Sequence, residues 1–547
     1  MWLSVSVLLS LLRAFAVAGK RVAVNWDVGY VDIDRDGYGI RWAIGVNGVL
    51  PIPPVMLTVG DTLVLTVHNS LNQTTAIHAH GLFQKGTNYM DGAAMVTQCG
   101  IPPGDQFTYE YVVGQAGTFW LHGHDRHQNA EGLRTPLVVY DRGKPPVKYD
   151  EDMLLSLEDW YTETFAERER VTLDPSLPFP PPHREGFGLI NGVNGNLTKP
   201  MHFRSGRTYR LRLVNMSSTR WFQFSLPGHV LHVVEADGQY TEPLEVDGVD
   251  IAPGQRYSVL VTAHSTSSLN YRYNVTMYAS FIPDEPGLSP RIFIGDVIYK
   301  QGAPFVQTGS YNDSFRWARD INLHALDKEP ALPVDRSLEL VIGRSLYSTG
   351  QNLDHFNNIT FSYPLTPALY SALSMGDMAT DKRVYGPQAH PIVLKHNEVI
   401  ELVIHNPEVV LHPLHLHGHA FQITEYGPTS PFIPSNATAV PVVKNSGVPA
   451  KRDTVVILPS HYVKLRFRAD NPGVWMLHCH MDIHFAMGLA LTFIEAPDVL
   501  QRTQNVPVGM LEMCAKQGIK TTGNAAGNHG LDLTGLPPVP TIVTHED

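Results

Sequence analysis

Histidines in pairs separated by one residue are the feature of this sequence with the clearest chemical meaning. On a β-strand, residues two apart lie on the same face, so each pair can present two imidazoles in one direction. Imidazole nitrogens bind copper and zinc well, and eight of them are enough for three metal ions that keep positions open for a small ligand. There are four such pairs: His78/His80, His122/His124, His415/His417 and His478/His480.

The last of these pairs encloses a cysteine, in the stretch Trp475–His484. We expect a strand running into a loop here, which turns Cys479 to one face and His478 and His480 to the other. This tripeptide can therefore contact two metal centres. A thiolate with two imidazoles and a weak axial neighbour is the preferred site of a blue electron-transfer copper. Cys479 and His484 can supply two of these ligands, and His412 can complete the site.

Zinc is the sharpest alternative for a chain with so much histidine. A structural zinc needs only four ligands, usually in two short clusters. Ten histidines and one cysteine spread over repeated segments exceed that need. Hydrogen-bonded strand histidines without a metal would explain a single His-x-His pair better than a ligand role does, but they do not explain four pairs in a duplicated pattern.

A threefold repeat supplies the elements that must position these ligands. With 547 residues the chain is too long for one core, and 45 glycines and 41 prolines favour short strands and turns over long helices. Each repeat contains two segments that alternate apolar and polar residues, as half-buried strands do. We therefore predict an all-β fold of three β-sandwich units. The first segments are residues 60–69, 206–215 and 396–406, and the second are residues 103–111, 253–261 and 459–467.

The histidine pairs occur in the first and third units only. His78-Ala-His80-Gly-Leu-Phe-Gln is echoed from His415 onward, and Gly117-Thr-Phe-Trp-Leu-His122-Gly-His124 is echoed from Gly473 onward. The middle unit has no counterpart to either motif, so we interpret it as a spacer. The predicted boundaries are a signal peptide at 1–18, domains at 19–145, 146–325 and 326–500, and a C-terminal tail at 501–547.

Composition and the N-terminus favour a secreted protein. The net charge of −11 argues against nucleic acid or an anionic membrane surface as a partner. An apolar run from Trp2 to Leu12, with Ala16 and Ala18 after it, is typical of a signal peptide, with a buried core segment as the alternative. No later segment is apolar enough for a membrane span, so we expect no transmembrane anchor. Seven glycosylation sequons fit this route: Asn72, Asn196, Asn215, Asn274, Asn312, Asn358 and Asn436.

Two cysteines remain once Cys479 is assigned to a metal site. In an oxidising compartment Cys99 and Cys514 can pair, which would tie the tail to the first domain. The alternative is two free buried thiols.

At the four histidine motifs the chain resembles the multicopper oxidases, a family that includes laccases, ascorbate oxidases and the iron-uptake ferroxidases of yeasts. The resemblance covers nearly all of the chain after the signal peptide. It implies three cupredoxin-like Greek-key domains that hold four copper ions, one of type 1, one of type 2 and a type 3 pair. By motif position, the implied ligands are His412, Cys479 and His484 for type 1, His78 and His415 for type 2, and His80, His122, His124, His417, His478 and His480 for type 3.

The resemblance also assigns roles to residues around the coppers. Leu489 occupies the axial position of the type 1 site and cannot coordinate, which raises the reduction potential by family analogy. Asp91 and Asp482 resemble acidic residues that supply protons for water formation. Electrons would pass from Cys479 through His478 and His480 to the oxygen site.

The reducing substrate is less clearly indicated than the cofactor. Glu408, four residues before His412, occupies the position of an acidic residue with which yeast-type ferroxidases hold Fe(II). Their second carboxylate is not matched convincingly by Glu185, and their membrane anchor is missing. We therefore expect a laccase-like oxidase of phenols, as in pigment pathways, with Glu408 accepting the phenol proton. A ferroxidase is the alternative, and a copper-storage protein is a third hypothesis.

Overall fold

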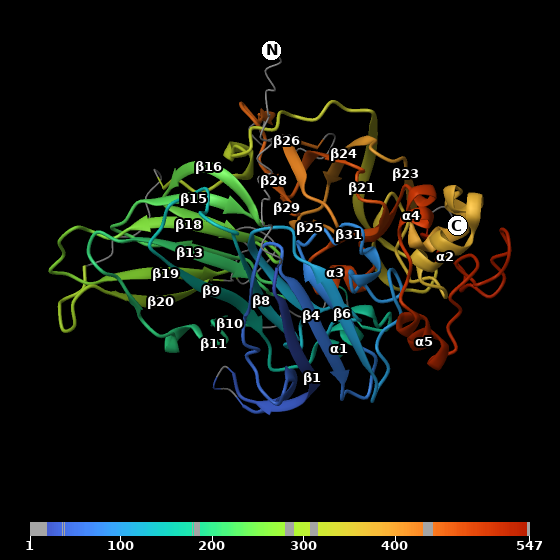
Figure 1. Ribbon diagram of the computed structural model, residues 1–547, viewed down its shortest axis with the longest axis horizontal. Coiled ribbons are helices and arrows are strands. Elements are labelled where there is room, and N and C mark those ends of the chain that lie inside the picture. The colour runs from blue at the N-terminus through green and yellow to red at the C-terminus, as the bar shows by residue number, and fades with distance from the viewer. Residues whose placement is uncertain are drawn as a thin grey trace, which may run out of the picture.

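The computed structural model describes residues 19–35, 37, 39–177, 179, 186–278, 289–306, 315–429 and 441–543. The predicted signal peptide, Glu185 and the sequons at Asn312 and Asn436 lie outside these residues. Within them, strands form six sheets, stacked as three sandwiches (Figure 1). The predictions of an all-β fold and of three β-sandwich units are confirmed. No helix in the described part of the chain has the length and apolar character to span a membrane.

The first sandwich is built from two four-stranded sheets. Its core includes Leu65, Tyr109 and Leu137, each at most 1% exposed. In spatial order, one sheet contains β2 (Arg41–Val46), β1 (Arg21–Ile33), β4 (Thr62–Asn69) and β6 (Gln106–Val112), and the other contains β3 (Val55–Thr58), β8 (Arg134–Tyr140), β7 (Gly117–Gly123) and β5 (Ile77–His80).

The second sandwich has one seven-stranded and one five-stranded sheet around its own core. The larger sheet contains β11 (Val193–Asn194), β10 (Phe187–Ile190), β9 (Glu151–Trp160), β13 (Thr208–Asn215), β18 (Arg256–Thr262), β15 (Leu231–Ala236) and β16 (Gln239–Val246). The smaller contains β12 (Met201–His202), β20 (Arg291–Ile298), β19 (Tyr271–Met277), β14 (Phe222–Ser225) and β17 (Gly248–Ile251).

The third sandwich repeats this plan. One sheet contains β22 (Asn352–Phe356), β21 (Arg336–Leu346), β24 (Val399–Asn406), β30 (His461–Arg468), β26 (Phe421–Pro428) and β27 (Val443–Lys444), with β28 (Lys451–Arg452) beside β26. The other contains β23 (Pro391–Leu394), β32 (Ala490–Glu495), β31 (Gly473–Cys479), β25 (His412–Leu416) and β29 (Thr454–Ile457).

The sheet orders confirm the threefold repeat. The predicted repeat segments form adjacent, hydrogen-bonded strands in each unit, namely β4 and β6, β13 and β18, and β24 and β30. Each first strand ends at an asparagine whose side-chain oxygen accepts a hydrogen bond from the backbone N–H two residues later: Asn69 accepts from Leu71, Asn215 from Ser217, and Asn406 from Glu408. The same local turn therefore recurs three times. The strands β5, β14 and β25 also correspond, and the middle one carries Phe222 and Phe224 where the others carry histidines.

In the described part of the chain, five short α-helices lie outside the sheets: α1 (Phe165–Leu173), α2 (Ala368–Ser374), α3 (Asp482–Ala486), α4 (Pro497–Thr503) and α5 (Val508–Lys516). Single 3₁₀ turns occur at Asn88–Met90, Gly195–Leu197, Asp320–Asn322, Gly376–Thr380, Lys382–Tyr385 and Pro387–Ala389. In α5, Met510 and Met513 pack into the core of the first sandwich. The disulfide Cys99–Cys514 joins the same two regions, as predicted.

We expect the double variant Cys99→Ser/Cys514→Ser to unfold at a lower temperature than the parent. The bond closes a loop with a sequence separation of 415 residues, so its loss frees the unfolded chain and typically costs about 2–5 kcal/mol. Calorimetry of the purified variant measures the shift, with the parent under reducing conditions as a second comparison. An unchanged melting temperature would mean that α5 is held by packing alone.

Candidate metal centres

The predicted metal ligands come from four strands of two domains. In the first domain, His78 on β5 pairs directly with His122 on β7, and in the third, His415 on β25 pairs with His478 on β31. His80 is the last residue of β5. In the other three pairs, the second histidine is the first residue after its strand. These strand ends face each other between the two domains, so ligands separated by more than 300 residues share one buried space.

Three of the predicted ligands form a mononuclear group of one cysteine and two histidines. The Cys479 sulfur lies 3.7 Å from Nδ1 of His412 and 3.7 Å from Nδ1 of His484. These two nitrogens are 3.2 Å apart. A nearly equilateral triangle of one sulfur and two imidazole nitrogens is a donor set for copper. His484 lies on the short helix α3, where the sequence predicted a loop.

The other eight histidines form a second, adjacent cluster, here called the histidine cluster. Within it, three groups have ligand atoms that all lie within 4.8 Å of one another. Three of the four His-x-His pairs are divided between groups, so His478 and His480 each belong to a different one, whereas His78 and His80 share a group. The groups are His78, His80 and His415; His80, His122 and His480; and His124, His417 and His478.

The hydrogen bonds of the histidine cluster leave nitrogens available for metal ions. Nδ1 of His78 donates to the Asp91 carbonyl (2.7 Å), that of His122 to the Gly123 carbonyl (3.0 Å) and that of His415 to the Asp453 carbonyl (3.0 Å). Nε2 of each ring is buried and has no protein partner within the described chain. A buried polar atom without a partner is costly, and a metal ion satisfies it. The residues therefore fit metal ions.

The electrostatics of the cluster favour neutral imidazoles, which are the form that binds metals. Burial lowers the pKa of His124 to about 3, with His78 as a further cause. Burial and neighbouring imidazoles lower the pKa of His122, His417 and His478 well below the usual value. Burial also raises the pKa of the Cys479 thiol, so a bound metal is needed to hold it as a thiolate.

Asp91 joins ligands of the first and third domains. One carboxylate oxygen accepts a hydrogen bond from His417 Nδ1 at 2.8 Å, and the other lies 3.2 Å from His78 Nδ1. Burial alone would raise the pKa of Asp91, but the two imidazoles lower it well below the usual value. Asp91 therefore orients two rings of the cluster, that of His417 through its buried carboxylate and that of His78 through its backbone carbonyl.

Asp482 and Leu489 lie near the ligands without replacing them. The Asp482 carboxylate accepts a hydrogen bond from the Asn129 amide at 3.3 Å, and burial raises its pKa to about 7. Leu489 is fully buried in the same core as Cys479, and its carbonyl accepts the Cys479 N–H at 3.0 Å. The proton-supplying role of Asp482 and the axial position of Leu489 stay predictions.

Three residues beside the cluster were missed by the sequence analysis. The Trp120 ring stacks on His122 with centroids 4.2 Å apart, and the period of two along β7 could have placed it on that face. Asp453 lies 3.1 Å from His80 Nε2, and Arg256 pairs with Asp453. No local motif marks these two, because they come from other repeats.

A cysteine–histidine site joined through one strand to a second centre of eight histidines defines a copper oxidase, which accepts electrons at one centre and reduces oxygen at the other. The comparisons with known proteins agree with this class. Family models described as multicopper oxidase match residues 27–144, 151–288 and 362–499. The chain belongs to the multicopper oxidase family. It is an oxidoreductase that uses four copper ions and O2 as the electron acceptor.

The similar proteins include iron oxidases and a laccase. The chain is 37% identical to the iron transport multicopper oxidase fetC of Epichloe festucae, over 97% of this chain and 86% of the relative. The crystal structure of Fet3p, a multicopper oxidase that functions in iron import, superposes with a TM-score of 0.85 at 31% identity, over 95% of this chain and 99% of Fet3p. A laccase from Botrytis aclada gives 0.74 at 26% identity, over 92% of both chains. These neighbours support the prediction of cupredoxin-like domains.

Proposed function

We propose that this protein oxidises Fe(II) to Fe(III) and passes the electrons to O2. The observation that carries the proposal is the contact between Glu408 and His412. A carboxylate oxygen of Glu408 lies 3.0 Å from His412 Nε2, and the Glu408 side chain is 14% exposed, whereas His412 is fully buried. Nδ1 of the same imidazole belongs to the mononuclear group. Glu408 is thus partly exposed to solvent and is connected, through the His412 ring, to the mononuclear group where electrons enter.

Glu408 is held in this position by the local turn of the third repeat. Its N–H donates to the Asn406 side chain at 3.1 Å, and its carboxylate contacts His412, four residues later in the sequence. The corresponding residues of the other repeats are Leu71 and Ser217, which carry no charge. Burial alone would raise the pKa of Glu408, but the His412 contact and Arg344 lower it. An ionised carboxylate results, and this hard ligand suits iron and favours Fe(III) over Fe(II).

The two centres then divide the reaction between them. We propose His412, Cys479 and His484 as the type 1 ligands, His78 and His415 as the type 2 ligands, and the other six histidines as the type 3 ligands. Bound copper supplies the one-electron steps and the reduction of O2. The chain supplies the connection: Cys479 belongs to one centre, and its neighbours His478 and His480 belong to the other. We assign delivery of protons to Asp482 and orientation of ligands to Asp91.

This proposal replaces phenol oxidation as the preferred hypothesis, because three relatives with 36–37% identity are named iron multicopper oxidases. Phenol oxidation remains a second candidate on one observation. Arg344 pairs with the buried Asp354, lies against the Phe179 ring and interacts electrostatically with Glu408. The guanidinium disfavours a second cation at this site, and the aromatic ring can pack against a phenol, whose proton Glu408 would accept to leave a phenolate.

Glu408→Ala tests the two candidates. If Glu408 binds Fe(II), kcat/KM for Fe(II) falls about 10- to 100-fold, the effect of losing one contact to a charged group. Turnover of a naphthol-type phenol falls much less. Steady-state oxygen consumption with each substrate measures both, and Glu408→Asp is the conservative control that keeps the carboxylate. A selective loss of phenol turnover, or Fe(II) turnover that does not saturate in the parent, would overturn the proposal.

We also propose that the protein acts in the secretory pathway or outside the cell. The disulfide Cys99–Cys514 supports this, because such bonds persist in oxidising compartments. Asn72 and Asn358 are exposed, as glycan acceptors must be. Asn215 is buried, and its amide donates to the carbonyls of Arg220 and Ile251, so this sequon cannot carry a glycan in the folded chain.

A further inference from the structure

Among its described residues, the middle domain contributes no histidine to either centre, yet it contacts the histidine cluster directly. Pro253-Gly254 is the turn of its repeat that precedes β18, and Gly254 has a φ of +86°. A Cβ at Gly254 would lie 2.9 Å from His480 Cδ2 and 3.1 Å from His80 Cε1. Only a glycine allows the backbone to lie this close to the two rings. The turn therefore forms one wall of the cluster.

Arg256, two residues later, reaches the cluster through Asp453. Its two terminal nitrogens donate to the two carboxylate oxygens of Asp453 at 2.8 and 2.7 Å. Its remaining donors reach the carbonyls of Thr118 in the first domain (2.8 Å) and Gly254 in its own domain (3.0 Å). Arg256 is fully buried. One guanidinium thus binds groups from all three domains.

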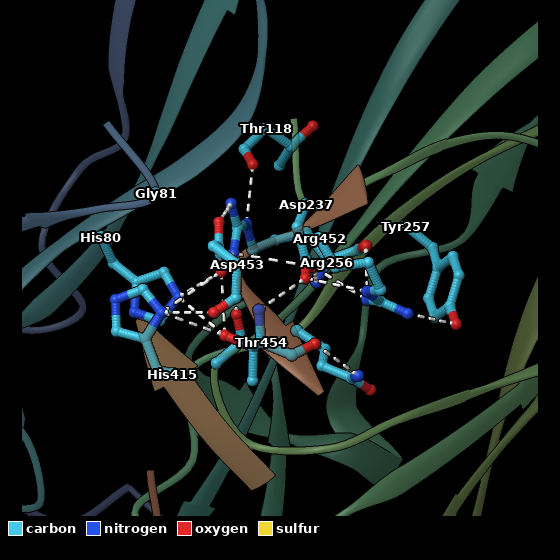
Figure 2. A network of polar contacts seen from close by, with 12 residues as sticks. His80, Gly81, Thr118, Asp237, Arg256, Tyr257, His415, Arg452, Asp453 and Thr454 are labelled. Atoms are coloured by element: carbon cyan, nitrogen blue, oxygen red, sulfur yellow. Dashed lines mark hydrogen bonds and ion pairs between the residues drawn. The ribbon is translucent and has the colours of Figure 1, made fainter. Parts of the chain in front are cut away.

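Asp453, in turn, contacts two imidazoles of the histidine cluster. One carboxylate oxygen lies 3.1 Å from His80 Nε2 and 3.4 Å from His415 Nδ1 (Figure 2). A carboxylate can only accept, so His80 must carry its proton on Nε2, which leaves Nδ1 as the lone pair for a metal. That Nδ1 faces His480 Nε2 at 3.2 Å. Asp453 therefore determines the tautomer of His80 and helps to position its ring, and Arg256 holds Asp453 in place.

The surrounding residues keep this pair in place. In Figure 2 the two imidazoles approach Asp453 from one side, and Arg256 and Arg452 lie on the other. Arg452 binds both carboxylate oxygens of Asp237 (2.8 and 2.9 Å), and Asp237 accepts the Arg256 backbone N–H (2.8 Å). Gly81, directly after His80, leaves the necessary room, because a Cβ there would lie 2.4 Å from the Arg256 guanidinium.

We propose that Arg256 of the middle domain is a positioning residue for the oxygen-reducing copper site, acting through Asp453 on His80 and His415. The proposal rests on the assignment of these histidines as copper ligands and is independent of the reducing substrate. The middle domain is then a structural part of the copper site, and the interpretation of it as a spacer is replaced.

The test compares Arg256→Gln and Arg256→Lys with Arg35→Gln. Arg35 is a buried arginine that also joins two domains, through Glu158 and the Gly192 carbonyl, and it serves as the matched control. The measurements are copper per chain after dialysis against a chelator, the type 2 paramagnetic resonance spectrum, the blue absorption and the melting temperature of the copper-free protein.

We expect Arg256→Gln to retain copper about 10- to 100-fold less tightly at the histidine cluster and to keep the blue absorption, since outer contacts of ligands have effects of this size. Arg256→Lys should show an altered type 2 spectrum with intermediate copper retention. Arg35→Gln should lower only the melting temperature. Parent-like copper content and spectra in both Arg256 variants would overturn the proposal. If Arg256→Gln is not recovered folded, an unaltered type 2 spectrum in Arg256→Lys overturns it by itself.

Discussion

Replacing Cys479 with serine is expected to remove the blue absorption and to abolish turnover of every reducing substrate, while the copper ions of the histidine cluster stay bound. The Cys479 sulfur is the one soft donor in the mononuclear group, and a serine oxygen is a poor substitute for it. The same residue joins that group to His478 and His480 in one strand, so its loss also interrupts the path for electrons. Absorption spectroscopy, copper content and oxygen consumption measure the three effects.

The double variant Cys99→Ser/Cys514→Ser is the matched control for this experiment. It also replaces cysteine sulfur with a hydroxyl group, but at a disulfide whose two cysteines belong to none of the ligand groups. It should keep the blue absorption and the turnover number at temperatures below its melting transition. Residual blue absorption in Cys479→Ser, or turnover above the copper-free background, would contradict the assignment of Cys479.

Asp91→Ala is expected to produce the complementary defect. Without the carboxylate, His417 loses the acceptor that orients its ring and His78 loses a nearby negative charge, although its Nδ1 keeps the Asp91 carbonyl as acceptor, and copper retention at the histidine cluster should weaken about 10- to 100-fold. The mononuclear group is untouched, so the blue colour persists. We expect the reducing substrate to bleach this colour and oxygen to fail to restore it, because electrons enter but cannot leave.

Stopped-flow absorption under anaerobic and then aerobic conditions measures this defect. Asp91→Asn should lie between Asp91→Ala and the parent, since an amide oxygen still accepts one hydrogen bond but carries no charge. Asp250→Asn is the control, because Asp250 is a carboxyl group of the second domain whose pKa burial raises to about 6. Normal reoxidation in Asp91→Ala with full copper content would show that Asp91 does not position the ligands.

The space around each strand explains why only one of the two related strands, β7 and β31, carries a cysteine. The first domain has Gly123 where the third has Cys479. A Cβ at Gly123 would lie 2.7 Å from Gln128 Cβ and 2.9 Å from Leu133 Cδ2. The first domain therefore has no room for a side chain at this position, and the third domain alone can build the electron-entry site.

The ligand residues could be read from the sequence because they follow local rules. The expected period of two near β5, β7, β25 and β31 marks the histidines of each pair as possible ligands, although three of the second histidines follow directly after their strands, and the recurrence of the motif indicates that two units contribute ligands. The repeat segments ending at Asn69, Asn215 and Asn406 were recognisable for the same reason, since alternation and a terminal turn are properties of neighbouring residues.

The tertiary structure decided which side chains complete the centres. His417 and Asp91 are 326 residues apart, and His80 and Asp453 are 373 apart. Glu408 and His412 are four residues apart in the sequence, but only the fold shows that the Glu408 side chain is partly exposed to solvent. No periodicity links Arg256 to the cluster, because its partners belong to three different domains. The sequence alone determined the donors, since they depend on the period of a strand. Their hydrogen-bond partners and tautomers depend on how the domains pack, and only the folded chain brings those surfaces together.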